Sequence, residues 1–209
     1  MLTSLSLTDF LQETASNAPA PGGGSVSALA AALGASLTSM VCRLTMGKKK
    51  YAEVQSEMET VLKQSEALRD KFAAMIDEDT TAYNKVMAAY GLPKETEEQK
   101  VKRTLEIQAA MKTATLVPLK LMELCRVTME LVKIVIERGN KNSLSDAGVA
   151  ALMLHSGCEG AALNVKTNLA GIQDLAFVET QRTAAHTIQT GMNQDLRRLL
   201  TRINEEFSK

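Results

Sequence analysis

The sequence predicts an all-α protein: a single domain over residues 1–209, folded as a bundle of five to seven helices, several of them long, with one helix interrupted by proline. Three observations favour this class. Apolar residues recur in steps of three and four over long stretches, no stretch alternates as a strand does, and glycine or proline stands where the periodic segments end. Aromatic residues make up 3% of the chain, so small and unbranched side chains must fill the core, which suits closely packed helices.

The periodic segments predict helices over residues 8–17, 25–45, 52–90, 96–138, 145–169 and 175–207. We expect Ser25 to be the N-cap of the second helix and Pro118 to kink or break the fourth. The remaining boundaries fall at residues that end helices: Pro19, Pro21, Gly91, Pro93, Gly139 and Asn140.

Composition limits the classes of function. Lysine plus arginine equals aspartate plus glutamate at 24 each, so the chain has no general attraction for nucleic acid or an anionic membrane. Three widely spaced cysteines without a paired pattern indicate free thiols in a reducing compartment, and two histidines offer little for zinc. Without a basic and then apolar N-terminal stretch, the chain is expected to be cytoplasmic.

Residues 26–42 contain no charged side chain, which approaches the length of a membrane span. The stretch is rich in alanine and includes several serines, whereas membrane spans are normally longer and more apolar. We therefore expect a buried helix, with a subunit interface as one way to bury it.

The segment from Pro19 to Ser25 stands directly before this apolar helix. Three glycines, Gly22, Gly23 and Gly24, allow a ligand to approach the backbone, and a helix N-terminus favours an anionic or electron-rich group. A plain turn between two helices would use the same residues. The two prolines favour an ordered loop over a flexible linker.

Asp79 interrupts the apolar stripe of the third helix, between Met75 and Ala82. A carboxylate in such a position must be paired, hydrogen-bonded or protonated, and perturbed carboxylates gather at functional sites. Two structural alternatives are that the helix has left the core at this point, or that Asp79 forms an ion pair with a lysine. We expect Asp79 to be functional.

Two polar clusters add amide and carboxyl groups. Asn142 lies beside Ser143 and Asp146, whose spacing fits a capping box, so a plain helix start is one explanation. Asn164 and Asn168 are four residues apart and therefore share a helix face, which Lys166 does not.

The run Lys48, Lys49, Lys50 and Tyr51 is typical of a solvated turn, yet beside a glycine loop it could hold a carboxylate. No phosphate-binding loop with its lysine is present, and His155 and His186 lack the partners of a nucleophilic triad.

These segments together resemble the formiminotransferase-cyclodeaminase family, in its cyclodeaminase-like helical domain. The resemblance covers nearly the whole chain in order. It is carried by residues 19–25, by 47–51, by 79–83 with Tyr83, by 139–142 with 145–146, and by 163–165 with Asn168. The 47–51 run and residues 90–94 are most similar to the stand-alone methenyltetrahydrofolate cyclohydrolases of the family.

The resemblance implies a folate enzyme of one-carbon metabolism that forms a homodimer and needs no cofactor or metal beyond tetrahydrofolate. Asp79 and Asp146 would be the catalytic carboxylates. The implied binding residues are Gly22, Gly23, Gly24, Ser25, Lys48, Lys49, Tyr83, Asn142, Asn164 and Asn168, with the two lysines on the glutamate tail.

Three functions stay open at this point. The first is hydrolysis of 5,10-methenyltetrahydrofolate to 10-formyltetrahydrofolate, and the second is release of ammonia from 5-formiminotetrahydrofolate. Both reactions pass through a tetrahedral carbon between two nitrogens, so one site could serve either. The third is a non-catalytic helical interaction module, which leaves Asp79 and the glycine loop without a purpose.

Overall fold

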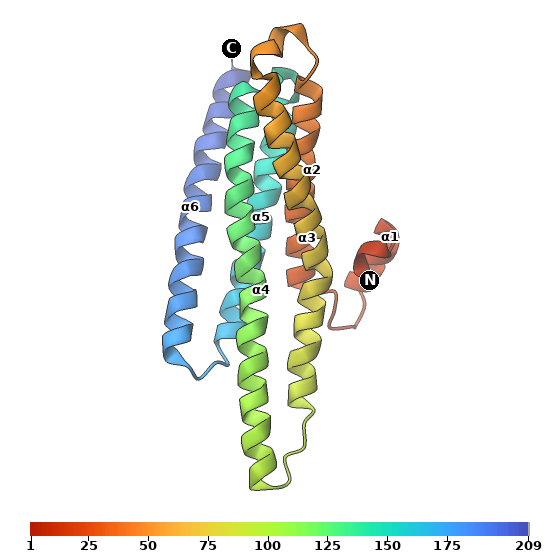
Figure 1. Ribbon diagram of the computed structural model, residues 1–209, viewed down its shortest axis with the longest axis vertical. Coiled ribbons are helices and arrows are strands. Elements are labelled where there is room, and N and C mark those ends of the chain that lie inside the picture. The colour runs from red at the N-terminus through yellow and green to blue at the C-terminus, as the bar shows by residue number, and fades with distance from the viewer. Residues whose placement is uncertain (209) are drawn as a thin grey trace.

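The computed structural model describes residues 1–208, and within that range its regular structure is helical throughout (Figure 1). The predicted all-α bundle is therefore confirmed. The α-helices are α1 (Leu7–Thr14), α2 (Gly23–Thr45), α3 (Gln55–Tyr90), α4 (Glu97–Arg138), α5 (Leu144–Leu169) and α6 (Leu175–Phe207). Three short 3-10 helices, η1 (Leu2–Ser4), η2 (Lys49–Val54) and η3 (Lys141–Ser143), occupy connections and the N-terminal segment.

Helix α2 lies between α3 and α5, and α4 packs against both of those helices (Figure 1). The α3–α4 hairpin is the longest part of the molecule and projects beyond the other helices at one end (Figure 1). Helix α2 runs antiparallel to α3, because Ser25 bonds to the Ile76 carbonyl whereas Ser39 bonds to Ser65 (2.7 Å). The part of α3 that follows Ile76 therefore extends beyond the N-terminus of α2.

Small residues let α2 and α5 approach each other closely. A side chain at Gly157 would meet the Ser27 carbonyl and Ala31, and one at Gly34 would meet Leu154. A small residue on one helix therefore makes room for the backbone or for a larger side chain such as Leu154 on the other.

By length and hydropathy, α2 could cross a membrane, but most of its apolar window is buried inside the bundle. Ala31, Ala35, Val41 and Cys42 are wholly inaccessible to solvent. The helix therefore has the character of a core helix, as the alanine-rich sequence predicts.

Pro118 neither ends nor divides its helix, because α4 continues from Glu97 to Arg138. Proline removes the N–H that would bond to the carbonyl four residues earlier, that of Ala114. The Asn168 side-chain amide of α5 donates to this carbonyl instead (3.0 Å). Of the two expected outcomes, a kink or a break, the break is therefore wrong, and Asn168 compensates for the missing bond.

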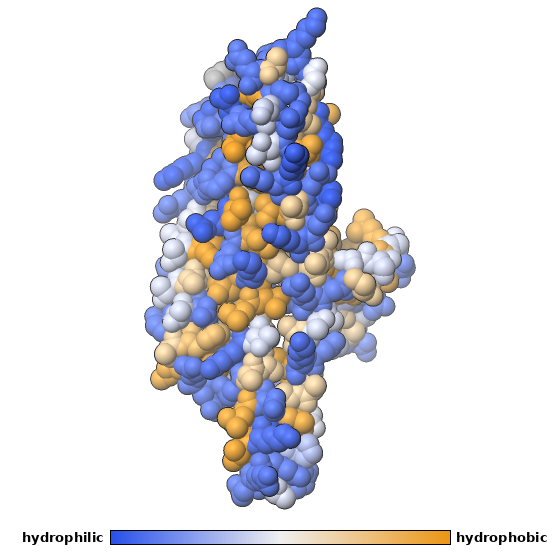
Figure 2. Space-filling model, viewed as in Figure 1, coloured by the Kyte–Doolittle hydropathy of each residue, from blue (hydrophilic) through white to orange (hydrophobic). Residues whose placement is uncertain are grey.

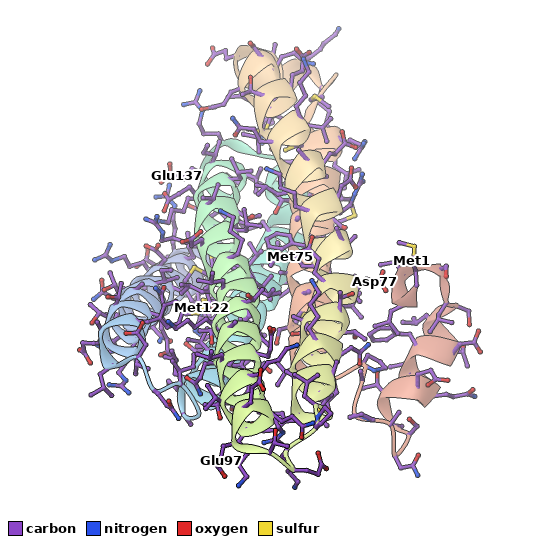
Figure 3. The ribbon with its side chains drawn as sticks, turned by 60° about the horizontal axis from the view of Figure 1, so that its bottom comes forward. Met1, Met75, Asp77, Glu97, Met122 and Glu137 are labelled. Atoms are coloured by element: carbon purple, nitrogen blue, oxygen red, sulfur yellow. The ribbon has the colours of Figure 1, made fainter. Side chains whose placement is uncertain are left out.

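The N-terminal segment is attached to the outer side of α3. Asp77 accepts hydrogen bonds from the Leu2 backbone N–H (2.6 Å) and the Thr3 hydroxyl (2.9 Å), and Figure 3 shows Asp77 on the side of α3 that faces this segment. These bonds lower the pKa of the Asp77 carboxyl. Phe10 of α1 is buried. Helix α1 itself spans Leu7–Thr14 and is shorter than the predicted 8–17.

Candidate active site

The glycine loop and Asp79 meet at the N-terminus of α2. Gly22 is the N-cap residue of α2 and has an extended backbone conformation, and no side-chain hydrogen bond from the N-cap position caps the helix. The prediction that Ser25 is the N-cap is wrong, because Ser25 lies inside the first turn and its hydroxyl donates to the Ile76 carbonyl of α3 (2.8 Å). The first N–H groups of α2 lack partners within the helix, so an acceptor must come from elsewhere.

Asp79 provides such an acceptor from α3. The Ser25 backbone N–H lies close enough to this carboxylate to lower its pKa, and the carboxylate Oδ2 lies 3.4 Å from the Ser25 hydroxyl oxygen. The carboxylate sits against Gly24 so closely that a methyl group at that position would overlap it. Glycine is thus required at position 24 because Asp79 occupies the space of a side chain.

Burial raises the pKa of the Asp79 carboxyl, and this effect outweighs the lowering by the hydrogen bonds from Ser25. A raised pKa makes the carboxylate a stronger base than a solvated aspartate. The half-buried position leaves part of the carboxyl accessible to a ligand.

Asn164 of α5 completes one side of this group. Its side-chain nitrogen would lie 3.6 Å from a Cβ at Gly23, and it donates to the Gly160 carbonyl (2.9 Å), which leaves its amide oxygen available. Asn168 lies one turn further along α5 and uses its amide nitrogen on Ala114. Tyr83, one turn after Asp79 on α3, is half-buried.

The other predicted site residues gather at the opposite end of α2. The Lys141 backbone N–H donates to the Tyr51 hydroxyl (3.0 Å), and Asn140 bonds to the Thr45 hydroxyl (2.8 Å) and the Leu44 carbonyl (3.0 Å). This end carries Lys48, Lys49, Asn142 and Asp146. Ser143 is the N-cap residue of α5, so the plain helix start is present, but its side chain makes no cap hydrogen bond.

Within one chain these two groups are separated by the length of α2, which is about 33 Å at the helical rise. The structure thus brings together Gly22–Ser25, Asp79 and Asn164, with Tyr83 and Asn168 next to them. It does not bring Lys48, Lys49, Asn142 or Asp146 into this group.

Thr80 is one residue that the sequence reasoning missed, since its hydroxyl lies 3.4 Å from that of Ser25. Its position directly after Asp79 was the available signal. The two hydroxyls and the carboxylate form one polar group at the start of α2.

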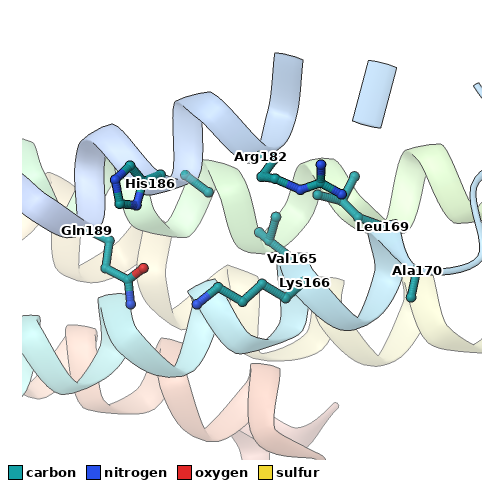
Figure 4. Close-up of a pocket in the computed structure, with 8 residues that line it drawn as sticks. Val165, Lys166, Leu169, Ala170, Arg182, His186 and Gln189 are labelled. Atoms are coloured by element: carbon teal, nitrogen blue, oxygen red, sulfur yellow. The ribbon is translucent and has the colours of Figure 1, made fainter. Parts of the chain in front are cut away.

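A cavity of about 430 Å³ lies on another side of α5, between α5 and α6, and contains none of the predicted site residues (Figure 4). Lys166, Arg182, His186 and Gln189 line it together with Val165 and Leu169. Lys166 thus faces away from Asn164, as its spacing predicts. Over residues 1–208, His, Cys, Asp and Glu side chains form no group of three or more that could hold a metal ion.

The fold and this group of residues define a helical bundle with a half-buried carboxylate at a glycine-lined helix start. The family model described as formiminotransferase-cyclodeaminase matches residues 6–187, and the chain belongs to this family. The resemblance found in the sequence is thereby confirmed.

Among its relatives, a methenyltetrahydrofolate cyclohydrolase of Methylorubrum extorquens is 52% identical over 170 residues, which cover 81% of this chain and 82% of the relative. A formimidoyltransferase-cyclodeaminase of Rattus norvegicus is 36% identical over 87% of this chain, and the match spans 34% of that longer protein. The crystal structure of formiminotetrahydrofolate cyclodeaminase from Thermotoga maritima superposes with a TM-score of 0.89 at 29% identity, over 99% of this chain and 100% of that one.

Proposed function

We propose that the protein is a methenyltetrahydrofolate cyclohydrolase, which hydrolyses 5,10-methenyltetrahydrofolate to 10-formyltetrahydrofolate. The observation that carries the proposal is the half-buried Asp79 carboxylate at the N-terminus of α2. The 52% identity to a cyclohydrolase supports this reaction over others of the family.

The methenyl bridge is a cationic carbon between N5 and N10 of the folate. Asp79 balances this charge and accepts a proton as water adds to the carbon. The proton then passes to N5 as the bond between N5 and the carbon breaks. The hydroxyl group of the tetrahedral intermediate loses its own proton to solvent, so the formyl group remains on N10 and one proton is released overall. A carboxyl with a raised pKa suits both the uptake and the return of the proton.

Neighbouring groups orient the substrate in this proposal. The N–H groups of Gly23 and Gly24 at the start of α2 point outward from the helix, and the Asn164 amide oxygen is free to accept from the pterin. Tyr83 contacts the ring system. Asn168 bonds to the Ala114 carbonyl of α4 near Pro118 and lies one turn from Asn164 on α5.

We propose that a second copy of this chain packs against α2 and α5. Large apolar side chains remain 39–63% exposed on these two neighbouring helices, namely Val26, Leu33, Leu44, Val149, Leu152 and Leu163. Between Gly23 and Cys42 the sequence of α2 has no charged residue to solvate this face. An uncharged apolar face of this kind is typical of a protein interface.

A two-fold axis across the middle of α2 makes the two copies of that helix antiparallel. The end that carries Lys48, Lys49, Asn142 and Asp146 then lies beside the glycine loop of the partner subunit. The dimer therefore explains why the predicted site residues occur at both ends of α2: each site takes residues from both chains.

The function is tested by adding the purified protein to 5,10-methenyltetrahydrofolate and following the loss of its near-ultraviolet absorbance. Ammonia release from 5-formiminotetrahydrofolate is measured in parallel. Faster loss of the methenyl absorbance with little ammonia release supports the cyclohydrolase. If the purified protein neither binds folate nor shows either activity, only the helical interaction module remains as an explanation.

The shared site is tested by co-expressing Asp79→Asn and Asp146→Asn chains. Half of the randomly formed dimers are hybrids, and each hybrid retains one intact site if both chains contribute to it. The mixture should then recover about a quarter of the wild-type activity although each parent is inactive. Recovery no greater than the mean of the two parents would refute the shared arrangement.

Formiminotetrahydrofolate cyclodeaminase is the second candidate function, favoured by the structural match to the Thermotoga maritima enzyme. In either reaction we propose a cytoplasmic enzyme that uses no cofactor beyond its folate. The three buried, unpaired cysteines are compatible with a reducing compartment.

A further inference from the structure

The site described so far does not explain how the anionic tail of a folate is held within one chain. Lys48 and Lys49 lie at the far end of α2 from Asp79, so they can reach the site only from a partner subunit. A cation that belongs to the same chain as Asp79 must be sought along α3, which continues beyond the start of α2.

Four residues of α3 lie on one face of that continuation: Asp79, Tyr83, Val86 and Tyr90. Their steps of four, three and four residues keep them within a narrow stripe about 16 Å long at the helical rise. Tyr83 and Val86 are half-buried, and Tyr90 is 45% exposed. The stripe is thus an accessible, largely apolar path that begins at the proposed catalytic carboxylate.

Contacts of Tyr90 show that the far end of this stripe faces α4 and the end of α5. The Tyr90 hydroxyl lies 3.9 Å from the Met111 sulfur, and the Met111 side chain fills the space next to Gly171. Gly171 follows α5, the helix that carries Asn164 and Asn168. Tyr90 therefore lies on the same side of the hairpin as the proposed folate-binding amides.

Arg103 of α4 stands beside this end of the stripe. Its guanidinium lies 5.6 Å from the centre of the Tyr90 ring and donates two hydrogen bonds to the Tyr90 carbonyl, at 3.0 Å and 3.2 Å. Within residues 1–208 the structure shows no ion pair between this guanidinium and a carboxylate, whereas nearby Lys100 is paired with Glu97 (2.6 Å). Arg103 therefore retains both its charge and unused N–H donors.

On the basis of the proposed folate site, we propose that the aromatic and glutamate part of the substrate lies along Tyr83, Val86 and Tyr90, and that Arg103 binds a tail carboxylate. An arginine fixed against an aromatic ring presents its fork in a defined direction, which favours a bidentate carboxylate contact. The α3–α4 hairpin, which projects from the body with hydrophobic side chains exposed (Figure 2), would then be a substrate-binding element as well as a structural one.

The experiment compares four proteins: wild type, Arg103→Gln, Arg103→Lys and the matched control Lys102→Gln, which removes one charge from an adjacent, exposed position. KM and kcat are measured with 5,10-methenyltetrahydrofolate and with 5,10-methenyltetrahydropteroate, which lacks the glutamate. Arg103→Gln should raise KM for the folate about tenfold, the loss expected for a hydrogen bond between charged groups, and leave KM for the pteroate unchanged. Arg103→Lys should restore part of the loss, and Lys102→Gln should match the wild type.

A purely structural Arg103 would give a different result, because loss of its bonds to Tyr90 would affect both substrates equally. That outcome, or an unchanged KM for the folate, would overturn the inference and assign the tail to Lys48 and Lys49. A wild-type protein without turnover would refute the proposed function instead. In that case calorimetric binding of p-aminobenzoylglutamate to wild type and to Arg103→Gln still decides whether Arg103 holds the carboxylate.

Discussion

Replacement of Asp79 by asparagine tests the central residue of the site. Asparagine has the same shape, and its amide oxygen can still accept a hydrogen bond from the Ser25 hydroxyl, whose oxygen lies 3.4 Å from Asp79 Oδ2. The substitution therefore removes the negative charge and the proton acceptor with little change in packing. General acid–base catalysis contributes about 10²- to 10⁴-fold, so kcat should fall by this factor, equivalent to about 3–5 kcal/mol in the barrier.

The same substitution, Asp79→Asn, should increase the stability of the folded protein although it lowers kcat. Because burial raises the Asp79 pKa above that of the unfolded chain, the folded protein binds this proton more tightly and the ionised carboxylate costs stability. This cost appears as pH rises from the ordinary aspartate pKa through the raised folded value. Asp79→Asn should therefore have a higher Tm than the wild type at pH 7, and the difference should shrink towards pH 4.

The assay combines methenyl absorbance for kcat with thermal unfolding across pH. A variant whose kcat lies within about threefold of the wild type would refute the catalytic role of Asp79, since that loss is far below the expected contribution. A large fall in Tm at pH 7 would show instead that the charge itself stabilises the start of α2.

Other predictions concern glycine, proline and cysteine. Gly24→Ala should reduce kcat at least 100-fold because a methyl group displaces Asp79, whereas the control Gly191→Ala, in open space on α6, should stabilise the protein by about 0.5–1 kcal/mol without loss of activity. Asn168→Ala should lower the free energy of unfolding, measured by chemical denaturation, by about 1–3 kcal/mol. In a Pro118→Ala background the loss should be smaller, because the backbone N–H of residue 118 can then bond to the Ala114 carbonyl. Equal losses in the two backgrounds would contradict this coupling. The three cysteines are buried, and burial raises the pKa of Cys42 to about 11 and that of Cys158 to about 12, so Ellman's reagent should not label the native protein at pH 8; rapid labelling of all three would be contrary to the structure.

The sequence was sufficient for the fold because periodicity and helix-ending residues are local signals. Helices α3, α4, α5 and α6 begin and end within a few residues of the predicted positions. Pro118 was misjudged because its missing bond is replaced by Asn168, fifty residues later in the chain. Ser25 was misjudged for a similar reason, since its hydroxyl is engaged by α3 and not by its own helix.

The site was only partly predictable. An aspartate on an apolar stripe and a glycine run before a helix are each visible in the sequence, and the antiparallel packing of α2 on α3 places them together. The predicted helix over residues 25–45 already separates Lys48 from the glycine loop by its own length. The order of residues along the chain gives no sign that Asn142 lies at the same end of that helix as Lys48. Arg103 was overlooked because nothing in its surroundings in the sequence separates it from other exposed cations.

The close contact between α2 and α5 has a consequence for how members of this family can diverge. Ser27 and Ala31 already touch Gly157, so their side of α2 has no volume in which a larger residue could fit. Evolution can change this helix only on its outward side or at its two ends. In this protein the closely packed middle of α2 and α5 thus acts as a spacer that fixes how far apart the two polar ends of the bundle are.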